Sequence, residues 1–513
     1  MITELRRQYV DPSVEIRLIV EQTIRGIPRV LIDTTTGRLL DKTQQVLAFE
    51  KLPIYSELVS SMTTQLDPAR IQREVKQYYR YVMLSHKWDD NEPLLQTVEN
   101  ISVYELEVSP ETTKLQMFCS LVRSLGFHWA WSDTCCVDKS NHVVLQESLV
   151  AMFTWYHGSS LTIVYLRGVS SQSQEPGGLQ GSIWNTRAWT YQEYVAAEIV
   201  QFYTEDWKPY LGLTLSNHKH SPAVVSEMEQ VSGVSAKELA VLRPGLHRVR
   251  EKLHLASRRR TTLVEDIAYS LLGIFNAPIP VIYGEGNRAV GRLLEHILTG
   301  SGDVTILAWT GTAGTYNSCL PMDLTVYNQL VPRHVPPLIE AAKLDRIVTE
   351  LRSSLPDLTH VMRLYDRLHE LPSPSIASSR LRLPGIVFRL TDLVHTSGPD
   401  PIHVYHASMS TLGDIEIRTV DDLTGMNVLY LVHPWIRPLL DQEFSDGETT
   451  RDSMIQALRL VARLRQPFGA LLFKPLSRVE YRRVAADSLI TVQVREEAPL
   501  TDLVDNIRTI EVH

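Results

Sequence analysis

Short hydrophobic runs alternate with helix-like stripes of hydrophobic residues between positions 81 and 203. Four runs have the length and composition of buried strands, and they cover Tyr81–Ser85, 128–132, Leu161–Leu166 and 198–203. Between them, hydrophobic residues recur at helical spacing over 109–126 and 145–158, and another helix is expected to start near Trp184. Ser109 and Pro110 are typical of a helix start. The alternation predicts an α/β fold with a parallel sheet covered on both faces.

Polar segments follow these strands in the sequence. Residues 86–92 follow the first strand, residues 133–141 follow the second, and the loop 170–182 leads into the stretch 184–193. Because ligands bind beyond the carboxyl ends of parallel strands, we expect the three segments to converge on one edge of the sheet.

The stretch 184–193 has two interpretations. It contains Trp184, Arg187, Trp189 and Glu193 within about three helical turns. In one interpretation the tryptophans anchor an amphipathic helix in the core and Glu193 is solvated. In the other, large aromatic side chains beside one acid line a ligand cleft. This stretch alone leaves both open.

The rest of the chain divides into three further regions by pattern. We expect an N-terminal extension over 1–75, the α/β core over 76–210, a helical extension over 211–300 and a β-rich domain over 301–513 with a helical insertion near 336–372. A dense hydrophobic face at 263–275 predicts a helix, and 304–309 is expected to be a strand. Further strands are expected at 385–390, 403–407, 414–419, 426–432, 468–473, 488–494 and Ile507–Val512, with a helix near 453–463.

Gly284 and Gly286 precede a helix-like stripe and so resemble half of a phosphate-binding loop. The remaining glycine spacing and the Lys-Ser/Thr ending of such a loop are absent. We expect a turn with a helix cap.

Composition narrows the class of protein. A chain of 513 residues with 44% hydrophobic and 21% charged residues is typical of a globular protein with two or three domains. The net charge of −8 gives no support to a nucleic-acid partner, and the basic run 258–260 is expected to be a solvated helix entry. No signal peptide or membrane-spanning run is expected.

The cysteines are too few for a disulfide framework in a chain of this length. We expect Cys119, Cys135, Cys136 and Cys319 to be thiols in a reducing compartment, and the protein to be cytoplasmic. Adjacent cysteines are a poor spacing for zinc, so no metal site is expected. A nucleophilic Cys135 would need His86 or His128 as its base, and buried inert thiols are the favoured interpretation.

A single carboxylate among tryptophans suits cleavage of an N-glycosidic bond to a cationic leaving group. Such a reaction needs little acid catalysis. It needs a carboxylate that holds ribose hydroxyls and stabilises oxocarbenium-like charge, together with aromatic faces that stack on the base. Glu193 is the candidate carboxylate.

Several motifs in order resemble the HET (heterokaryon incompatibility) domain of filamentous fungi. They read Y-V-M-L-S-H-K-W at 81–88, W-S-D-T-C-C-V-D-K at 131–139, M-F-x-W-Y at 152–156 and W-T-Y-Q-E at 189–193. The segments 265–275 and 283–286 are similar to those that commonly follow this domain. The chain departs from the family at Asp89, where glycine is usual, and at Tyr191, where leucine is usual. Asp89 adds bulk and charge to its loop.

The resemblance implies a protein of non-self recognition and programmed cell death. HET domains are in turn similar to TIR (Toll/interleukin-receptor) domains, which implies a TIR-like, flavodoxin-like sheet. By analogy with NAD-cleaving TIR domains, Glu193 would be catalytic, and NAD or a related nucleotide would be a substrate rather than a bound cofactor. The binding residues expected with it are Ser85, His86, Trp88, Asp89, Asp133, Trp184 and Trp189.

The alternative is a non-catalytic module. It would self-associate through the same surface and recognise a protein partner through the β-rich C-terminal domain. Access to Glu193 distinguishes the two: an open pocket beside Ser85 and Asp133 favours catalysis, whereas burial in an ion pair favours the module.

Overall fold

The computed structural model divides into two compact units, each of which is described separately. The first comprises Met1–Pro244, Arg259–Thr262 and Tyr269–Val281, and the second comprises Gly245–Arg258, Leu263–Ala268 and Ile282–His513. The described residues are 11–62, 65–172, 175–240, 242–328, 341–354, 358–398, 400–409, 413–426, 428–435, 453–464, 466–495 and 500–513. Residues 173–174 of the predicted loop and residues 336–340 and 355–357 of the predicted insertion lie outside them.

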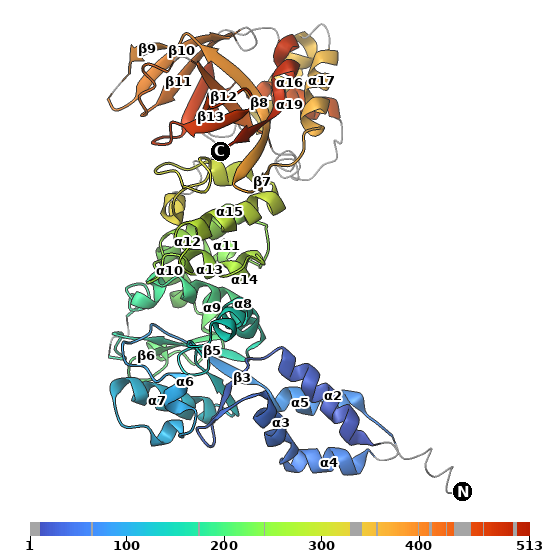
Figure 1. The fold of residues 1–513 in the computed structure, drawn as a ribbon, viewed down its shortest axis with the longest axis vertical. Coiled ribbons are helices and arrows are strands. Elements are labelled where there is room, and N and C mark those ends of the chain that lie inside the picture. The colour runs from blue at the N-terminus through green and yellow to red at the C-terminus, as the bar shows by residue number, and fades with distance from the viewer. Residues whose placement is uncertain are drawn as a thin grey trace, which may run out of the picture. The chain divides into compact units, whose positions relative to one another are not determined.

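A six-stranded sheet is the centre of the first unit (Figure 1). Its order is β2-β1-β4-β3-β5-β6. Four strands are parallel, which confirms the predicted sheet: β3 (Tyr81–Ser85), β4 (Trp129–Trp131), β5 (Leu161–Leu166) and β6 (Val200–Thr204). At one edge, β1 (Leu31–Asp33) pairs antiparallel with β4 and with β2 (Leu39–Leu40).

Three helices connect the parallel strands: α7 (Pro110–Ser124), α8 (His142–Gly158) and α9 (Trp189–Ala196). Ser109 caps α7 by accepting a hydrogen bond from the Thr112 N–H, as its sequence predicted. Crossovers between parallel strands are right-handed, so the strand order puts α7 on one face and both α8 and α9 on the other. Figure 1 shows α8 beside α9, and the two helices pack together.

Shorter helices complete the first unit and begin the second. The N-terminal ones are α2 (Pro12–Arg25), α3 (Lys42–Glu50), α4 (Pro53–Ser61) and α5 (Pro68–Tyr78). The later ones are α10 (Pro222–Ser232), α11 (Ala236–Ala240), α12 (Val249–Ser257), α13 (Asp266–Tyr269), α14 (Leu272–Phe275) and α15 (Arg288–Ser301). The prediction of one helix over 263–275 was wrong, because the segment forms the two short helices α13 and α14.

The turn before α15 is held by a carboxylate. Glu265 Oε1 accepts hydrogen bonds from the Gly284 N–H at 2.8 Å and the Gly286 N–H at 2.9 Å. Both glycines have positive φ, and Asn287 is the N-cap of α15. The expected turn is confirmed, although the Asn287 side chain makes no capping hydrogen bond. The backbone amides that a phosphate would need are occupied by Glu265.

A ten-stranded sheet dominates the C-terminal part of the second unit. Its path runs β12-β8-β16-β14-β13-β15-β11-β10-β9, and pairing of β12 with β13 closes five strands into a ring. The strands are β7 (Ser375–Ala377), β8 (Arg380–Thr391), β9 (Val394–Ser397), β10 (His403–Met409), β11 (Gly413–Thr419), β12 (Val428–Pro434), β13 (Phe468–Pro475), β14 (Glu480–Val484), β15 (Ile490–Val494) and β16 (Ile507–Val512).

The predicted β-rich C-terminal region is confirmed, with errors at particular segments. Sequence patterning missed β7, β9 and β14. The strand predicted at 304–309 was wrong, since Val304–Leu307 is the 3₁₀ helix η5. Its amide and carbonyl groups do not join a sheet, and Arg250 and Arg483 donate hydrogen bonds to carbonyl groups in and just after it.

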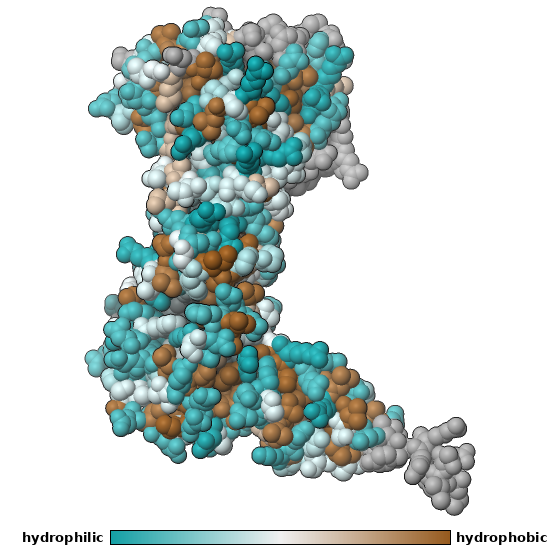
Figure 2. Space-filling view, in the orientation of Figure 1, coloured by the Kyte–Doolittle hydropathy of each residue, from teal (hydrophilic) through white to brown (hydrophobic). Residues whose placement is uncertain are grey.

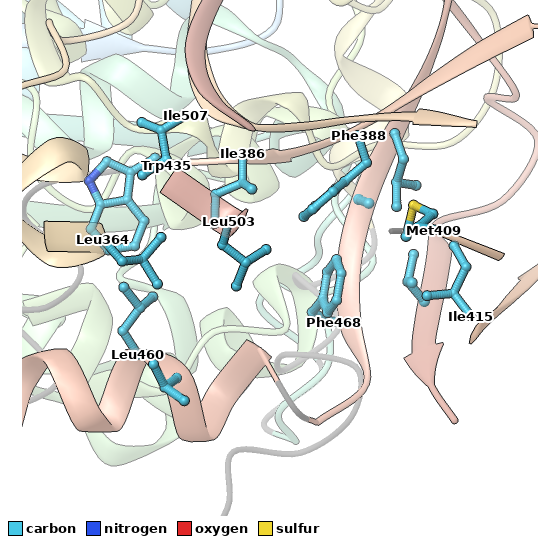
Figure 3. Packing of buried hydrophobic residues seen from close by; sticks show 14 of the residues in the cluster. Leu364, Ile386, Phe388, Met409, Ile415, Trp435, Leu460, Phe468, Leu503 and Ile507 are labelled. Atoms are coloured by element: carbon cyan, nitrogen blue, oxygen red, sulfur yellow. The ribbon is translucent and has the colours of Figure 1, made fainter. Parts of the chain in front are cut away.

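Among the described residues, the helices α16 (Ala341–Ser354) and α17 (Thr359–His369) pack against α19 (Ser453–Leu464), and all three share a buried hydrophobic cluster with this sheet. Figure 3 shows Leu364 and Leu460 from these helices near Trp435 and Leu503, while Phe388, Met409 and Ile415 come from the strands. These residues belong to one buried cluster, which fixes the helices against the sheet.

Hydrophobic and hydrophilic side chains are intermixed on the face of the molecule shown in Figure 2. Within the described ranges, every helix is too short or too polar to cross a membrane.

Gly273 lets α14 approach α8 closely within the first unit. A Cβ atom at Gly273 would lie 2.1 Å from Phe153 Cβ, far inside van der Waals contact. We predict that Gly273→Ala lowers the free energy of unfolding by about 1–3 kcal/mol through overpacking. Urea denaturation followed by circular dichroism measures this. Gly26→Ala, whose added Cβ would lie 3.8 Å from the Thr23 carbonyl oxygen, is the control. Equal stability of the two variants would contradict the packing argument.

Candidate functional site

A hydrogen-bonded cluster forms where β3 ends. Ser85, the last residue of β3, donates a hydrogen bond from Oγ to Glu193 Oε2 on α9. The Trp184 Nε1–H in turn donates to Ser85 Oγ at 2.8 Å. Trp184 lies in the 3₁₀ helix η2 (Ile183–Thr186), and α9 begins only at Trp189. The stretch where one helix was expected to start near Trp184 therefore forms two separate helices. The structure therefore brings together Ser85, Trp184 and Glu193.

This cluster lies at a topological switch point of the sheet. The connection from β3 leads to β4 on one side, and the connection from β4 returns to β5 on the other side of β3. In open α/β sheets the crevice beyond such a point is the usual place for a ligand. Ser85 is therefore at the position where the topology favours binding.

Glu193 is buried without an ion pair. Glu193 is only 4% exposed. Within the described part of the chain, no Lys, Arg or His nitrogen lies within 4.0 Å of its carboxylate. Burial raises the pKa of Glu193 to about 8, and the nearby Asp133 adds to this; the hydrogen bond from Ser85 and the charges of Arg187 and Arg259 act in the opposite direction. At neutral pH the folded protein holds this carboxyl group mainly in its protonated form.

Arg259 approaches this region from the strand-like segment that follows α12. Its guanidinium donates to the Arg187 carbonyl oxygen at 2.9 Å and to Thr190 Oγ1 at 3.0 Å. It also lies 5.1 Å from the centroid of the buried Tyr191 ring, the position where leucine was expected. Arg259 therefore influences Glu193 electrostatically while its own hydrogen bonds go to neutral groups.

Trp88 and Asp133 form a second, more exposed part of the site. Trp88 is 40% exposed, and its Nε1–H donates to Asp133 Oδ2 at 2.6 Å. The Lys139 ammonium lies 3.4 Å from the centroid of the Trp88 ring, a cation–π contact. Asp133 Oδ1 is buried and has no hydrogen-bond partner among the described residues. Since buried polar atoms are normally satisfied, this oxygen is a candidate contact for a ligand.

His86 and Asp89 belong to a network of buried charges beside the cluster. His86 Nε2 lies 3.0 Å from Glu92 Oε2, and Lys114 Nζ contacts both Glu92 and Asp89. Arg167 pairs with the other oxygen of Asp89. The charge that Asp89 adds to its loop is thus compensated by two cations, and the structure directs Asp89 to them rather than to Glu193.

Trp189 is half-buried, and no hydrogen bond or ring contact joins it to Ser85, Trp184 or Glu193 in the described structure. Seven of the eight predicted residues thus lie in two hydrogen-bonded groups and one charge network, and Trp189 lies apart. Sequence reasoning missed Lys114, Lys139 and Arg167. In the sequence, each of them is only a cationic residue on a predicted helix or loop. Such residues are too common to be identified as partners of the acidic segment 86–92.

The cysteines are all buried free thiols, as expected. A hydrogen bond with Cys136, together with burial, raises the pKa of Cys135 well above its usual range, which disfavours a thiolate nucleophile. Across the described ranges, no group of three or more His, Cys, Asp or Glu side chains is arranged to hold a metal ion.

The shifted pKa of Glu193 makes folding stability depend on pH. At pH values between 4.5, the ordinary pKa of the group, and about 8, its pKa in the folded protein, the unfolded chain releases the proton that the folded protein retains. The resulting stabilisation is complete below pH 4.5 and is lost as pH rises towards 8, with a slope of about 1.4 kcal/mol per pH unit. We predict that Glu193→Gln removes this slope, so that the variant gains stability relative to wild type from pH 5 to 8.

Thermal denaturation over this pH range measures the difference, and Glu147→Gln on the exposed side of α8 is the control. Parallel pH profiles for wild type and Glu193→Gln would show that the carboxyl group is already ionised in the folded protein.

Comparisons with known proteins identify the domain that contains the first three parallel strands. The family described as Heterokaryon incompatibility protein (HET) matches residues 81–180, so its match ends before Glu193. The chain is also 33% identical over 276 residues to Vegetative incompatibility protein HET-E-1 of Podospora anserina. That alignment covers 51% of this chain and 18% of the relative, so the chain spans less than a fifth of that protein's length. No solved structure gives a significant match.

The match to the family over 81–180 and the similarity to HET-E-1 agree with the motifs found along the sequence. The segment 81–180 therefore matches the HET family, and the chain is similar to a vegetative incompatibility protein.

Proposed function

We propose that this chain is a HET-domain protein that acts in heterokaryon incompatibility, as a component of non-self recognition and programmed cell death. We further propose that its domain is TIR-like and hydrolyses NAD or a related nucleotide at the site around Glu193. The family match and the name of the relative support the first proposal. The order β4-β3-β5-β6 of the parallel strands supports the second, since it is the 2-1-3-4 order of flavodoxin-like sheets.

The observation that carries the enzymatic proposal is the buried, unpaired carboxyl group of Glu193 at the switch point. A buried ionisable group without a cation costs stability, and strongly shifted pKa values concentrate at functional sites. The orphan oxygen of Asp133 and the half-exposed ring of Trp88 add a polar contact and an aromatic face. Together they fit a ribose hydroxyl and a stacked base.

In the proposed reaction, a water oxygen bonds to the ribose C1′ while the C1′–N bond to nicotinamide breaks. The electron pair of that bond goes to the ring nitrogen, which loses its formal positive charge, and the water gives up a proton to solvent. Ionised Glu193 would stabilise the oxocarbenium-like charge on the ribose. The cationic ring of the substrate favours this ionisation, because a nearby positive charge lowers a carboxyl pKa.

The second candidate function is the non-catalytic module, and the burial of Glu193 favours it: at 4% exposure the carboxyl group can serve the fold alone. Pairing through the β6 edge is a poor route to its self-association. The Val200 N–H donates to Asn217 Oδ1 at 3.1 Å and the Phe202 N–H donates to His218 Nδ1 at 3.0 Å, so side chains already cover the free edge of β6.

Nicotinamide release from NAD by the purified chain tests the enzymatic proposal. We predict release by wild type, and its loss in Glu193→Gln, with Glu147→Gln as an active control. Because the carboxylate form is the reactive one, kcat/KM should rise with pH through about 8, the pKa of Glu193 in the free protein. No release of nicotinamide at high protein concentration, or equal release by wild type and Glu193→Gln, would reject the enzymatic proposal. The non-catalytic module would then be the remaining candidate function.

A further inference from the structure

Two histidines meet at the outer edge of the C-terminal sheet, far along the sequence from the HET domain. His395 lies on the terminal strand β9 and His403 on its neighbour β10 (Figure 1). His395 Nε2 and His403 Nδ1 are 3.1 Å apart. His395 is exposed and His403 is half-buried, so solvent reaches the pair.

The backbone and a neighbouring ring hold this pair in place. In the antiparallel register, His395 is opposite Tyr405, and His403 is two residues before Tyr405 on the same face of β10. The Tyr405 ring is 1% exposed, and its centroid lies 5.0 Å from that of His395 and 6.2 Å from that of His403. Tyr405 itself is fixed by hydrogen bonds, since its hydroxyl accepts from the Leu423 N–H at 2.8 Å and donates to Asp422 Oδ1 at 3.2 Å.

The distance between the two ring nitrogens fits coordination of one ion. Two imidazole nitrogens bound to the same Zn²⁺ at ~2.0–2.1 Å, with an angle of ~90–110° between the bonds, are about 2.8–3.4 Å apart. The observed 3.1 Å lies within this range. Hydrogen bonds from Thr424, together with the charge of His403, lower the pKa of Asp422, so this nearby carboxylate also favours a cation at the pair.

We propose that His395 and His403 bind a divalent transition-metal ion, with water in the remaining coordination positions. Imidazole nitrogen suits Zn²⁺, Ni²⁺ and Cu²⁺ rather than Mg²⁺ or Ca²⁺. Both rings bind as neutral imidazoles, with the proton of His395 on Nδ1 and that of His403 on Nε2, so the ion replaces the hydrogen bond between the rings. Bound across β9 and β10, the ion ties the last strand of the sheet to β10, with which it pairs.

Calorimetric titration of the metal-stripped full chain with Ni²⁺ and with Zn²⁺ tests the site. The variants are His395→Gln, His403→Gln and the double substitution, with His406→Gln, on the opposite face of β10, as the control. We expect wild type and the control to bind one ion more per chain than each of the three variants. Because either substitution removes the chelate, the double variant should lose no more than a single one.

The melting temperature separates this result from a folding defect. Without metal the exposed His395→Gln should melt like wild type, and added Ni²⁺ should raise the melting temperature of wild type more than that of the variant. Equal stoichiometry in wild type and His395→Gln would overturn the proposal, as would an equal Ni²⁺-dependent thermal shift.

Discussion

Burial of the Glu193 carboxyl group without a cation in contact is the constraint on which the candidate site depends. An ionised carboxylate in that position would be costly, so the folded protein retains the proton and supports the group through Ser85. Ser85 can do this because β3 ends at that residue, and the Trp184 indole fixes its hydroxyl oxygen. Hydrogen bonds therefore link Glu193, the end of β3 and the 3₁₀ helix η2.

The second unit accommodates buried charge in a related way. Arg483 of β14 is 7% exposed, and its guanidinium donates to the carbonyl oxygens of Leu307 and Trp309 at 3.0 Å each. It also lies 4.1 Å from the centroid of the Trp309 ring. Main-chain carbonyls and an aromatic face thus satisfy an arginine in the interior, as the carbonyl of Arg187 does for Arg259 in the first unit. For both arginines, neutral partners replace a counter-ion.

The sequence predicted the elements whose hydrophobic pattern is regular. The four parallel strands, the helix capped by Ser109 and the turn at Gly284 follow from local pattern and local chemistry. Prediction from the sequence failed where tertiary contacts bury a charged side chain. β14 contains two arginines and was not predicted as a strand, because no local rule indicates that carbonyl groups near Leu307 will receive Arg483.

The candidate site was predictable only in part for the same reason. Ser85, Asp133 and Glu193 could be placed at one edge from strand order. The orientation of each side chain could not: Asp89 turns to Lys114 and Arg167, and Trp189 lies apart, because each depends on partners from other elements. Hydrogen bonding of Glu193 to Ser85 rather than to a cation likewise depends on the packing of α9 against the sheet.

The ionisation of the Glu193 carboxyl group is the central claim. It can be measured by ¹³C NMR of the chain labelled at the side-chain carboxyl groups of glutamate. The carboxyl resonance missing from Glu193→Gln identifies the residue, and its chemical shift is followed from pH 4 to 9. The account predicts a midpoint near 8, raised by burial. A midpoint at or below the ordinary value of 4.5 would contradict it, because the carboxylate would then be paired or solvated in the folded protein.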